Sequence, residues 1–108
     1  MAELPPYTPD NWVIVEITYK DTAFYKVLAG WSGGYLDGDS WRMNSGITEV
    51  EEKEDYYLFY GQSGSVYKCW KEAEKTRINM GEPLAIIEAN DMAKVVEYKD
   101  IKNELKQK

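Results

Sequence analysis

The stretch that decides the fold runs from Tyr25 to Ile47 and reads YKVLAGWSGGYLDGDSWRMNSGI. Aromatic and β-branched residues alternate with other side chains at its start, so residues 23–31 predict a strand. Four glycines and two aspartates follow between residues 30 and 39 and predict a loop, because glycine adopts backbone angles that other residues avoid. Residues 41–47 then predict a short strand that ends at Asn-Ser-Gly. This succession of strands and glycine-rich turns predicts an antiparallel sheet.

The strand predicted over residues 23–31 has a partner on its N-terminal side. Residues 12–19 read WVIVEITY, a β-branched run that favours a strand over a helix, and residues 20–22 predict the turn of a hairpin. Because strand side chains alternate, we expect one face with Tyr25, Val27, Ala29 and Trp31 and an opposite face with Phe24, Lys26 and Leu28.

The chain after Ile47 predicts more strands and then a change of structure. Residues 48–52 and 56–60 predict a second hairpin, and residues 66–70 predict a fifth strand. From Lys71 helix formers replace strand formers, so residues 71–78 predict a short helix.

The C-terminal third is described by three further predictions. Pro83 fits either the first turn of a second short helix or the start of a strand, and both alternatives stay open. Residues 93–97 predict an edge strand, and residues 100–105 predict a helical turn.

Together these segments predict an α+β fold. A strongly curved antiparallel sheet of five or six strands, a small half-open barrel, carries one or two short helices in the C-terminal third. Residues 1–10 contain three of the four prolines and predict an extended Pro-rich N-terminal arm. Residues 11–108 predict a single α+β domain, since about 100 to 200 residues is the usual size of one domain.

Charge and cysteine content restrict the partners and the compartment. The formal net charge of −6 argues against a nucleic-acid partner, because phosphate contacts need clustered Lys and Arg. An acidic surface confers solubility or attracts a basic protein partner. The single cysteine excludes an internal disulfide and indicates a reducing compartment. No apolar run is long enough to span a membrane and the N-terminus lacks a signal-peptide pattern, so we expect a cytoplasmic protein with no membrane partner.

The chain lacks the residue patterns of common catalytic and cofactor sites. It contains no histidine, which removes the commonest general base and the commonest metal ligand. Cys69 reads as a buried strand thiol. The Asp37-Gly38-Asp39 segment lacks the further ligands of a calcium loop, and no phosphate-binding glycine motif is present. We therefore expect no metal and no cofactor.

One group of residues does suggest a binding site. Aromatic side chains offer stacking area, arginine offers a forked donor for a carboxylate or phosphate, and glycines let a ligand approach the backbone. The only two arginines each stand two residues before an asparagine, which on a strand places both side chains on the same face. An alternative is a structural salt bridge from Arg42 to Asp37 or Asp39. The candidate binding residues are Trp31, Tyr35, Trp41, Arg42, Asn44, Ser45, Ser63, Ser65 and Arg77.

Three segments resemble a known group of proteins. They are Trp-Ser-Gly-Gly-Tyr from residue 31, Ser-Trp-Arg-Met-Asn-Ser-Gly-Ile from residue 40 and Ser-Gly-Ser-Val-Tyr-Lys-Cys from residue 63. With them, residues 11–70 resemble small uncharacterised accessory proteins of tailed bacteriophages. The resemblance implies an accessory role inside an infected bacterium and carries over no catalytic residue.

Three functions remain open at this point. The leading hypothesis is a small non-enzymatic, phage-type accessory protein that binds and modulates a host component, most plainly a host protein. A second hypothesis is capture of a small anionic, nucleotide-like ligand in a pocket of aromatic residues and arginine. A third is a carboxylate-based enzyme that acts on a glycan through Glu49, Glu51 and Asp55.

Overall fold

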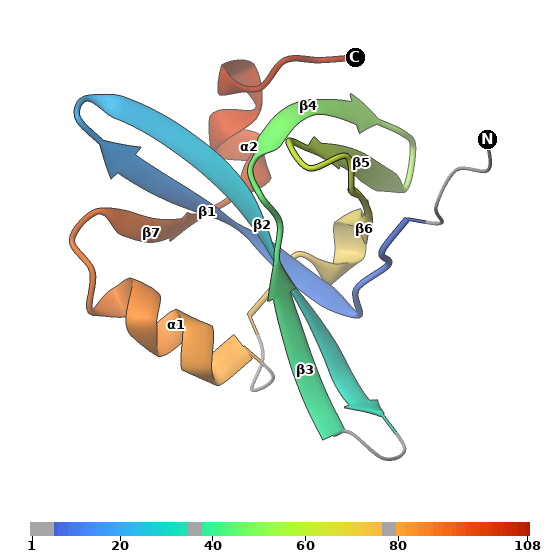
Figure 1. The fold of residues 1–108 in the computed structure, drawn as a ribbon. Helices are drawn as coiled ribbons and strands as arrows, with labels where there is room; N and C mark the ends of the chain where they lie inside the picture. The colour runs from blue at the N-terminus through green and yellow to red at the C-terminus, as the bar shows by residue number, and fades with distance from the viewer. Residues whose placement is uncertain (1–5, 35–37, 77–79) are drawn as a thin grey trace.

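The computed structural model describes residues 6–34, 38–76 and 80–108, whose strands form two antiparallel sheets (Figure 1). The α+β class, with antiparallel strands and with helices in the C-terminal third, is confirmed. The described strands number seven and are divided between two sheets, where the sequence predicts five or six strands in one. In chain order the elements are β1 (Asn11–Tyr19), β2 (Thr22–Gly34), β3 (Gly38–Met43), β4 (Ile47–Glu52), β5 (Tyr56–Gly61), β6 (Val66–Trp70), η1 (Lys71–Ala73), α1 (Gly81–Glu88), β7 (Ala93–Val96), α2 (Tyr98–Ile101) and η3 (Lys102–Glu104).

The first sheet has the strand order β3-β2-β1-β7. The predicted hairpin of β1 and β2 is present and closes at the pair Tyr19 and Thr22. Its two-residue turn holds Lys20 at φ 48° and Asp21 at φ 66°, which is the backbone of a type I′ turn. The edge strand predicted near residue 95 is β7.

The second sheet has the order β4-β5-β6. It begins after β3, where the chain leaves its pairing with β2. Gly46 makes this change of direction with a φ of 135°, and its carbonyl accepts the Gln62 N–H. Glycine is favoured there because an L side chain rarely adopts this φ. Residues 47–52 therefore pair with β5 and start a new sheet, which is why one curved sheet does not form.

Segments that lie outside the seven strands cover both outer strands of the second sheet. Tyr7 forms a parallel bridge with Tyr67 of β6, and Gln107 forms a parallel bridge with Val50 of β4. Covered edges protect a sheet from pairing with other chains.

The first sheet lies between two apolar layers because its side chains alternate. Trp12 and Ile14 of β1 point toward the second sheet and α2, whereas Val13 and Val15 pack with α1.

The face prediction for β2 is also confirmed. Tyr25, Val27, Ala29 and Trp31 belong to the cluster between the sheets, and Leu28 belongs to the cluster beneath α1.

Two local predictions are wrong. The helix predicted from Lys71 ends after one 3-10 turn, because Glu74 and Lys75 form an extended bridge with Trp12.

The loop predicted over residues 30–39 is largely a hairpin. β2 runs to Gly34, and Gly34 pairs with Gly38 of β3. An irregular register between Trp31 and Gly34 explains the glycines, which suit a bulge without packing a side chain. Of the two alternatives for Pro83, the helix is correct.

Candidate functional site

The predicted site residues fall into three separate groups in the structure. Trp31 and Arg42 lie beside the N-terminal arm, and Trp41 lies on the other face of the first sheet. Tyr35 and Arg77 lie outside the described residues. The remaining four, Asn44, Ser45, Ser63 and Ser65, gather around Gly61.

Arg42 belongs to what we call the arginine cluster, made of Tyr7, Trp31, Arg42 and Tyr67. Its Nη1 donates to the Tyr7 hydroxyl at 2.8 Å, and its guanidinium carbon lies 4.6 Å from the centre of the Tyr7 ring. The Tyr7 ring in turn lies 5.1 Å from the Tyr67 ring and 6.5 Å from the Trp31 ring. Burial raises the pKa of Tyr67, and the nearby Arg42 opposes this rise.

The backbone fixes Tyr7 in this position. The Tyr7 N–H donates to the Val66 carbonyl at 2.9 Å, and the Lys68 N–H donates to the Tyr7 carbonyl at 2.7 Å. One residue further along, the Thr8 carbonyl accepts the indole N–H of Trp31 at 3.1 Å. Tyr7 of the same chain therefore covers the Arg42 guanidinium, where the sequence predicts a pocket of aromatic residues and arginine. Sequence reasoning missed Tyr7 because an isolated tyrosine among prolines carries no strand pattern.

The alternative of a salt bridge from Arg42 to Asp37 or Asp39 stays a prediction. Asp37 and the side chain of Asp39 lie outside the described parts of the chain. Among the ion pairs between described residues, none includes Arg42.

Trp41 does not join Trp31, contrary to the predicted constellation. Trp31 pairs with Ser40 and Trp41 pairs with Gly30, and paired residues of a ladder share a face. Since Gly30 and Trp31 are consecutive, the two tryptophans point to opposite faces of the hairpin. The Trp41 side chain is 42% exposed.

The hairpin that carries Trp41 extends past the rest of the first sheet. The pairing of β1 with β2 ends at Asn11 and Gly30, whereas β2 and β3 remain paired out to Gly34 and Gly38. Figure 1 shows this end of β2 and β3 as a projecting arm, away from the second sheet. We call it the β2–β3 arm.

The polar residues around Gly61 form what we call the serine cluster, made of Asn44, Ser45, Ser63 and Ser65. The Ser45 hydroxyl donates to the Ser63 hydroxyl at 3.1 Å, and the Ser63 N–H donates to the Ser45 oxygen at 3.0 Å. The hydroxyl oxygens of Ser63 and Ser65 are 3.2 Å apart. The structure thus brings together the two Ser-Gly segments that follow β3 and β5.

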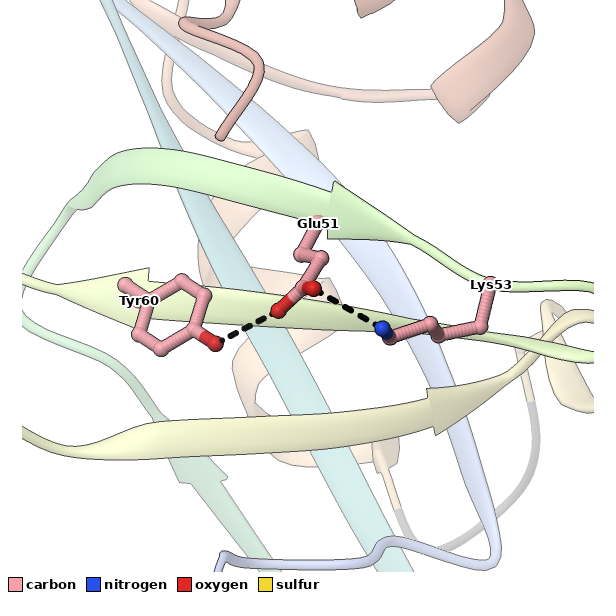
Figure 2. Close-up of polar contacts among 3 residues, drawn as sticks. All are labelled: Glu51, Lys53 and Tyr60. Carbon is pink, nitrogen blue, oxygen red and sulfur yellow. Dashed lines mark hydrogen bonds and ion pairs between the residues drawn. The ribbon is translucent and has the colours of Figure 1, made fainter.

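A different polar network lies on the β4–β5 pair, where Figure 2 shows Glu51 between Lys53 and Tyr60. Its carboxylate accepts from the Tyr60 hydroxyl at 3.0 Å and pairs with the Lys53 ammonium at 2.8 Å. The bond from Lys53 and then that from Tyr60 lower the pKa of Glu51. Glu51 therefore stays ionised at neutral pH, which suits a structural ion pair better than the acid of a glycosidase.

Two buried or half-buried groups have raised pKa values for another reason. Burial raises the pKa of Cys69 well above its ordinary value, with a smaller effect of Glu74, and the predicted buried thiol is confirmed. Burial also raises the pKa of Glu74, although its carboxylate accepts the Tyr98 N–H at 2.8 Å. A thiol held protonated is a poor nucleophile.

A surface pocket of about 450 Å³ opens between the tip of the β1–β2 hairpin, the start of β4 and the segment after η3. Phe24, Tyr25 and Glu104 are among its lining residues. Burial, then Glu16 and Glu104, raise the pKa of Tyr25. The field of these carboxylates does not favour an anionic ligand in this pocket.

Neither a metal centre nor a membrane segment is found in the described ranges. They hold no group of three or more His, Cys, Asp or Glu side chains placed to bind a metal. None of their helices combines the length and the hydropathy of a membrane-spanning segment. Comparison with known proteins finds no match for this chain among protein-family models, curated proteins or solved structures.

Proposed function

We propose that the chain is a small non-enzymatic binding protein that contacts a host protein inside an infected bacterium through its β2–β3 arm. The observation that carries this proposal is Trp41, a large aromatic side chain that is 42% exposed on a projecting hairpin. Tryptophan is among the residues that contribute most to protein interfaces. The resemblance to phage accessory proteins supplies the cellular setting.

The base of the arm is braced, which favours binding without a large loss of conformational freedom. The Trp31 indole bonds the Thr8 carbonyl, and the Ser32 N–H donates to the Asp10 carboxylate at 2.8 Å. A preorganised binding element loses less entropy when it meets its partner.

The net charge of −6 adds a preference for a basic partner surface. Opposite charges increase the association rate, and salt screens this effect. We therefore expect the complex to form more slowly at high ionic strength.

The nucleotide-like ligand is less well supported at Arg42. Tyr7 already stacks on the guanidinium and bonds to it, so a flat ligand would have to displace part of the N-terminal arm. The glycan hypothesis needs two carboxyl groups at one site, one with a lowered and one with a raised pKa. Among the described residues, the carboxyl groups with these two shifts, Glu51 and Glu74, belong to different hydrogen-bond networks. Glu51 is on the β4–β5 pair beside Tyr60, whereas Glu74 bonds to the first turn of α2.

Affinity capture from bacterial lysate tests the proposal with a matched pair of variants. Trp41→Ala should lose the retained host protein, by about tenfold or more if Trp41 is a hot spot. Phe24→Ala is the control, because Phe24 is 44% exposed but lies near the other end of β2. Retention of the same protein by Trp41→Ala and wild type, in equal amounts, would contradict the proposal.

A further inference from the structure

β3 covers only part of the outer edge of β2. The pairing of these two strands ends at Leu28 and Met43. One further rung joins the Asn44 N–H to the Val27 carbonyl at 3.0 Å. Residues 22–26 of β2 then continue toward the tip of the β1–β2 hairpin, and β1 is their only strand partner in the part of the chain that the structure describes. Figure 1 shows this half of β2 beyond the end of β3.

The backbone of Val27 shows which groups of this half face outward. Its carbonyl accepts the Asn44 N–H, and its N–H donates to the Asn44 Oδ1 at 2.8 Å, so both groups point away from β1. In an antiparallel strand the backbone groups of every second residue point the same way. The pairing of β1 with β2 has no register shift over residues 22–30. The N–H and carbonyl groups of Ala23 and Tyr25 therefore point to the open edge.

These four backbone groups are accessible to a ligand. Ala23 is exposed and Tyr25 is half-buried, and no described residue bonds to their outward groups. The pocket of about 450 Å³ lies along the same edge, between residues 21–25 and the segments 46–48 and 104–106. Its described lining residues include none of β1, which places it on the outer side of β2. We call the pocket, together with the open edge at Ala23 and Tyr25, the β2 groove.

The β2 groove suits an extended peptide backbone. Each of two alternate residues offers one donor and one acceptor, and an extended peptide presents the same groups at the same spacing. Open strand edges commonly pair with a strand from another chain. The outer strands of the second sheet are both covered, by Tyr7 and by Gln107, whereas this edge of β2 has room for a ligand.

The charges beside the groove favour a basic peptide. Asp21 and Glu104 are among the lining residues, and Lys106 is the one cation among those that the structure describes. The whole chain carries a formal net charge of −6. This charge attracts a segment with Lys or Arg and disfavours a second copy of the same chain.

Tyr25 reports the sign of the local potential. Glu16 is its cross-strand partner, and the Glu16 carboxylate lies 3.9 Å from the Lys94 ammonium. Burial, then Glu16 and Glu104, raise the pKa of Tyr25, as a negative potential does. The negative charge of the two glutamates therefore outweighs Lys94 at this position.

We propose that the β2 groove binds an extended, basic segment of a partner protein as an added strand. The segment pairs with Ala23 and Tyr25 in the line that β3 occupies further along β2, and its basic side chain lies opposite Tyr25 on the side of Glu104. The groove is at the opposite end of β2 from the β2–β3 arm, so this site stands or falls independently of Trp41.

The added strand uses backbone groups rather than the exposed ring of Phe24. Phe24 lies between Ala23 and Tyr25, so its N–H and carbonyl point toward Ile17 of β1. Phe24→Ala therefore leaves the open edge intact.

Titration of the isotope-labelled full chain with synthetic peptides, followed by NMR, tests the proposal. The probe is the blocked pentapeptide acetyl-Thr-Val-Arg-Val-Thr-amide, because strand addition relies on backbone bonds and tolerates many sequences. We expect saturable shifts and slower hydrogen exchange at the amides of Ala23 and Tyr25. The same peptide N-methylated at its arginine lacks the N–H that meets the Tyr25 carbonyl, and it should bind about tenfold more weakly. Absent shifts at both amides, or equal binding of the N-methylated peptide, overturn the proposal.

A pair of charge variants tests the basic character of the segment. Glu104→Lys should weaken binding of the arginine peptide by about threefold or more. Glu88→Lys is the control, because it changes the net charge equally at an exposed position of α1 outside the groove, and the affinity should persist. Equal affinities for the two variants, or for peptides with arginine and with glutamate at the centre, overturn the choice of a basic partner.

The same spectra distinguish a partner segment from a second copy of the chain. Protection of the Ala23 and Tyr25 amides that increases with protein concentration in the absence of peptide would show that the chain pairs with itself. That result also overturns the proposal.

Discussion

Tyr7 shows how much one residue contributes when it touches several distant segments. Its ring contacts Trp31 and Tyr67, its hydroxyl accepts from Arg42, and its backbone extends the edge of β6. The first sheet and the second sheet are thereby joined at one position. We infer that Tyr7 acts as a structural anchor.

Two substitutions at Tyr7 separate its polar contact from its packing. Tyr7→Phe removes only the bond to Arg42 and should reduce the free energy of unfolding by about 0.5–1.5 kcal/mol. Tyr7→Ala also removes the ring contacts and should cost about 2–4 kcal/mol. Urea unfolding followed by tryptophan fluorescence measures both. Equal stabilities of Tyr7→Ala and wild type would show that the arm does not anchor the sheets.

At the residue scale the chemistry of the candidate site was predictable, but its geometry was not. The Ser-Gly dipeptides and Arg42 are visible in the sequence, and the serines do come together. The division of Trp31 from Trp41 depends on the strand register, because a shift of one residue reverses the face of every side chain. The capture of Arg42 by Tyr7 joins residues 35 positions apart and leaves no local pattern.

Among the elements, the β1–β2 hairpin has the most unusual backbone. Lys20 and Asp21 have positive φ angles, which are strained for residues with a Cβ. A two-residue turn of this type strongly favours Asn-Gly. A turn with Asn-Gly at these two positions would therefore be more stable than the present turn with Lys20 and Asp21.

Replacement of Lys20-Asp21 by Asn-Gly should stabilise the protein. Relief of the strained φ angles outweighs the extra freedom of glycine in the unfolded chain, and the gain should be about 0.5–1.5 kcal/mol. The transition midpoint in urea should rise while its slope stays constant. A lower midpoint would show that Lys20 and Asp21 make stabilising contacts that the backbone argument overlooks.

The elements themselves were largely predictable because short-range pattern controls them. The strands β1, β4, β5 and β6 appear close to their expected bounds. The break into two sheets was not predicted, because the turn at Gly46 determines it together with a bond to Gln62 in another hairpin. The helix expected after Lys71 failed for a similar reason, since a tertiary bridge to Trp12 overrides helix propensity.

On the scale of the whole molecule, Glu74 connects the first sheet to the C-terminal helices. It follows β6 and η1 in the chain, bridges Trp12 of β1 and accepts the first N–H of α2. Because burial chiefly raises its pKa in the folded protein, the folded state binds the Glu74 proton more tightly than the unfolded state. The contribution of Glu74 to the free energy of unfolding must then decrease as pH rises from about 4.5, the ordinary pKa of a glutamate, through the raised pKa of Glu74.

Glu74→Gln should remove this loss of stability while keeping an oxygen for the Tyr98 N–H. The stability of the variant relative to wild type should therefore increase between pH 4.5 and neutral pH. Glu51→Gln is the control with the opposite sign, because the folded pKa of Glu51 is lowered. Its variant should lose stability relative to wild type at neutral pH, and the difference should shrink as pH falls. Urea unfolding from neutral pH to below pH 4.5 measures both, because the Glu51 effect is lost below 4.5 and the Glu74 effect develops above it. Parallel curves for wild type and Glu74→Gln contradict the assignment.

The three isolated bridges found among the described residues also bear on the order in which the chain folds. They link Tyr7 with Tyr67, Trp12 with Glu74 and Val50 with Gln107, and each closes a loop of more than fifty residues. The β1–β2 and β5–β6 hairpins need only short loops and form from neighbouring residues. Closing a long loop costs chain entropy before its contacts are gained, so we expect docking of the preformed hairpins to be the slow step of folding.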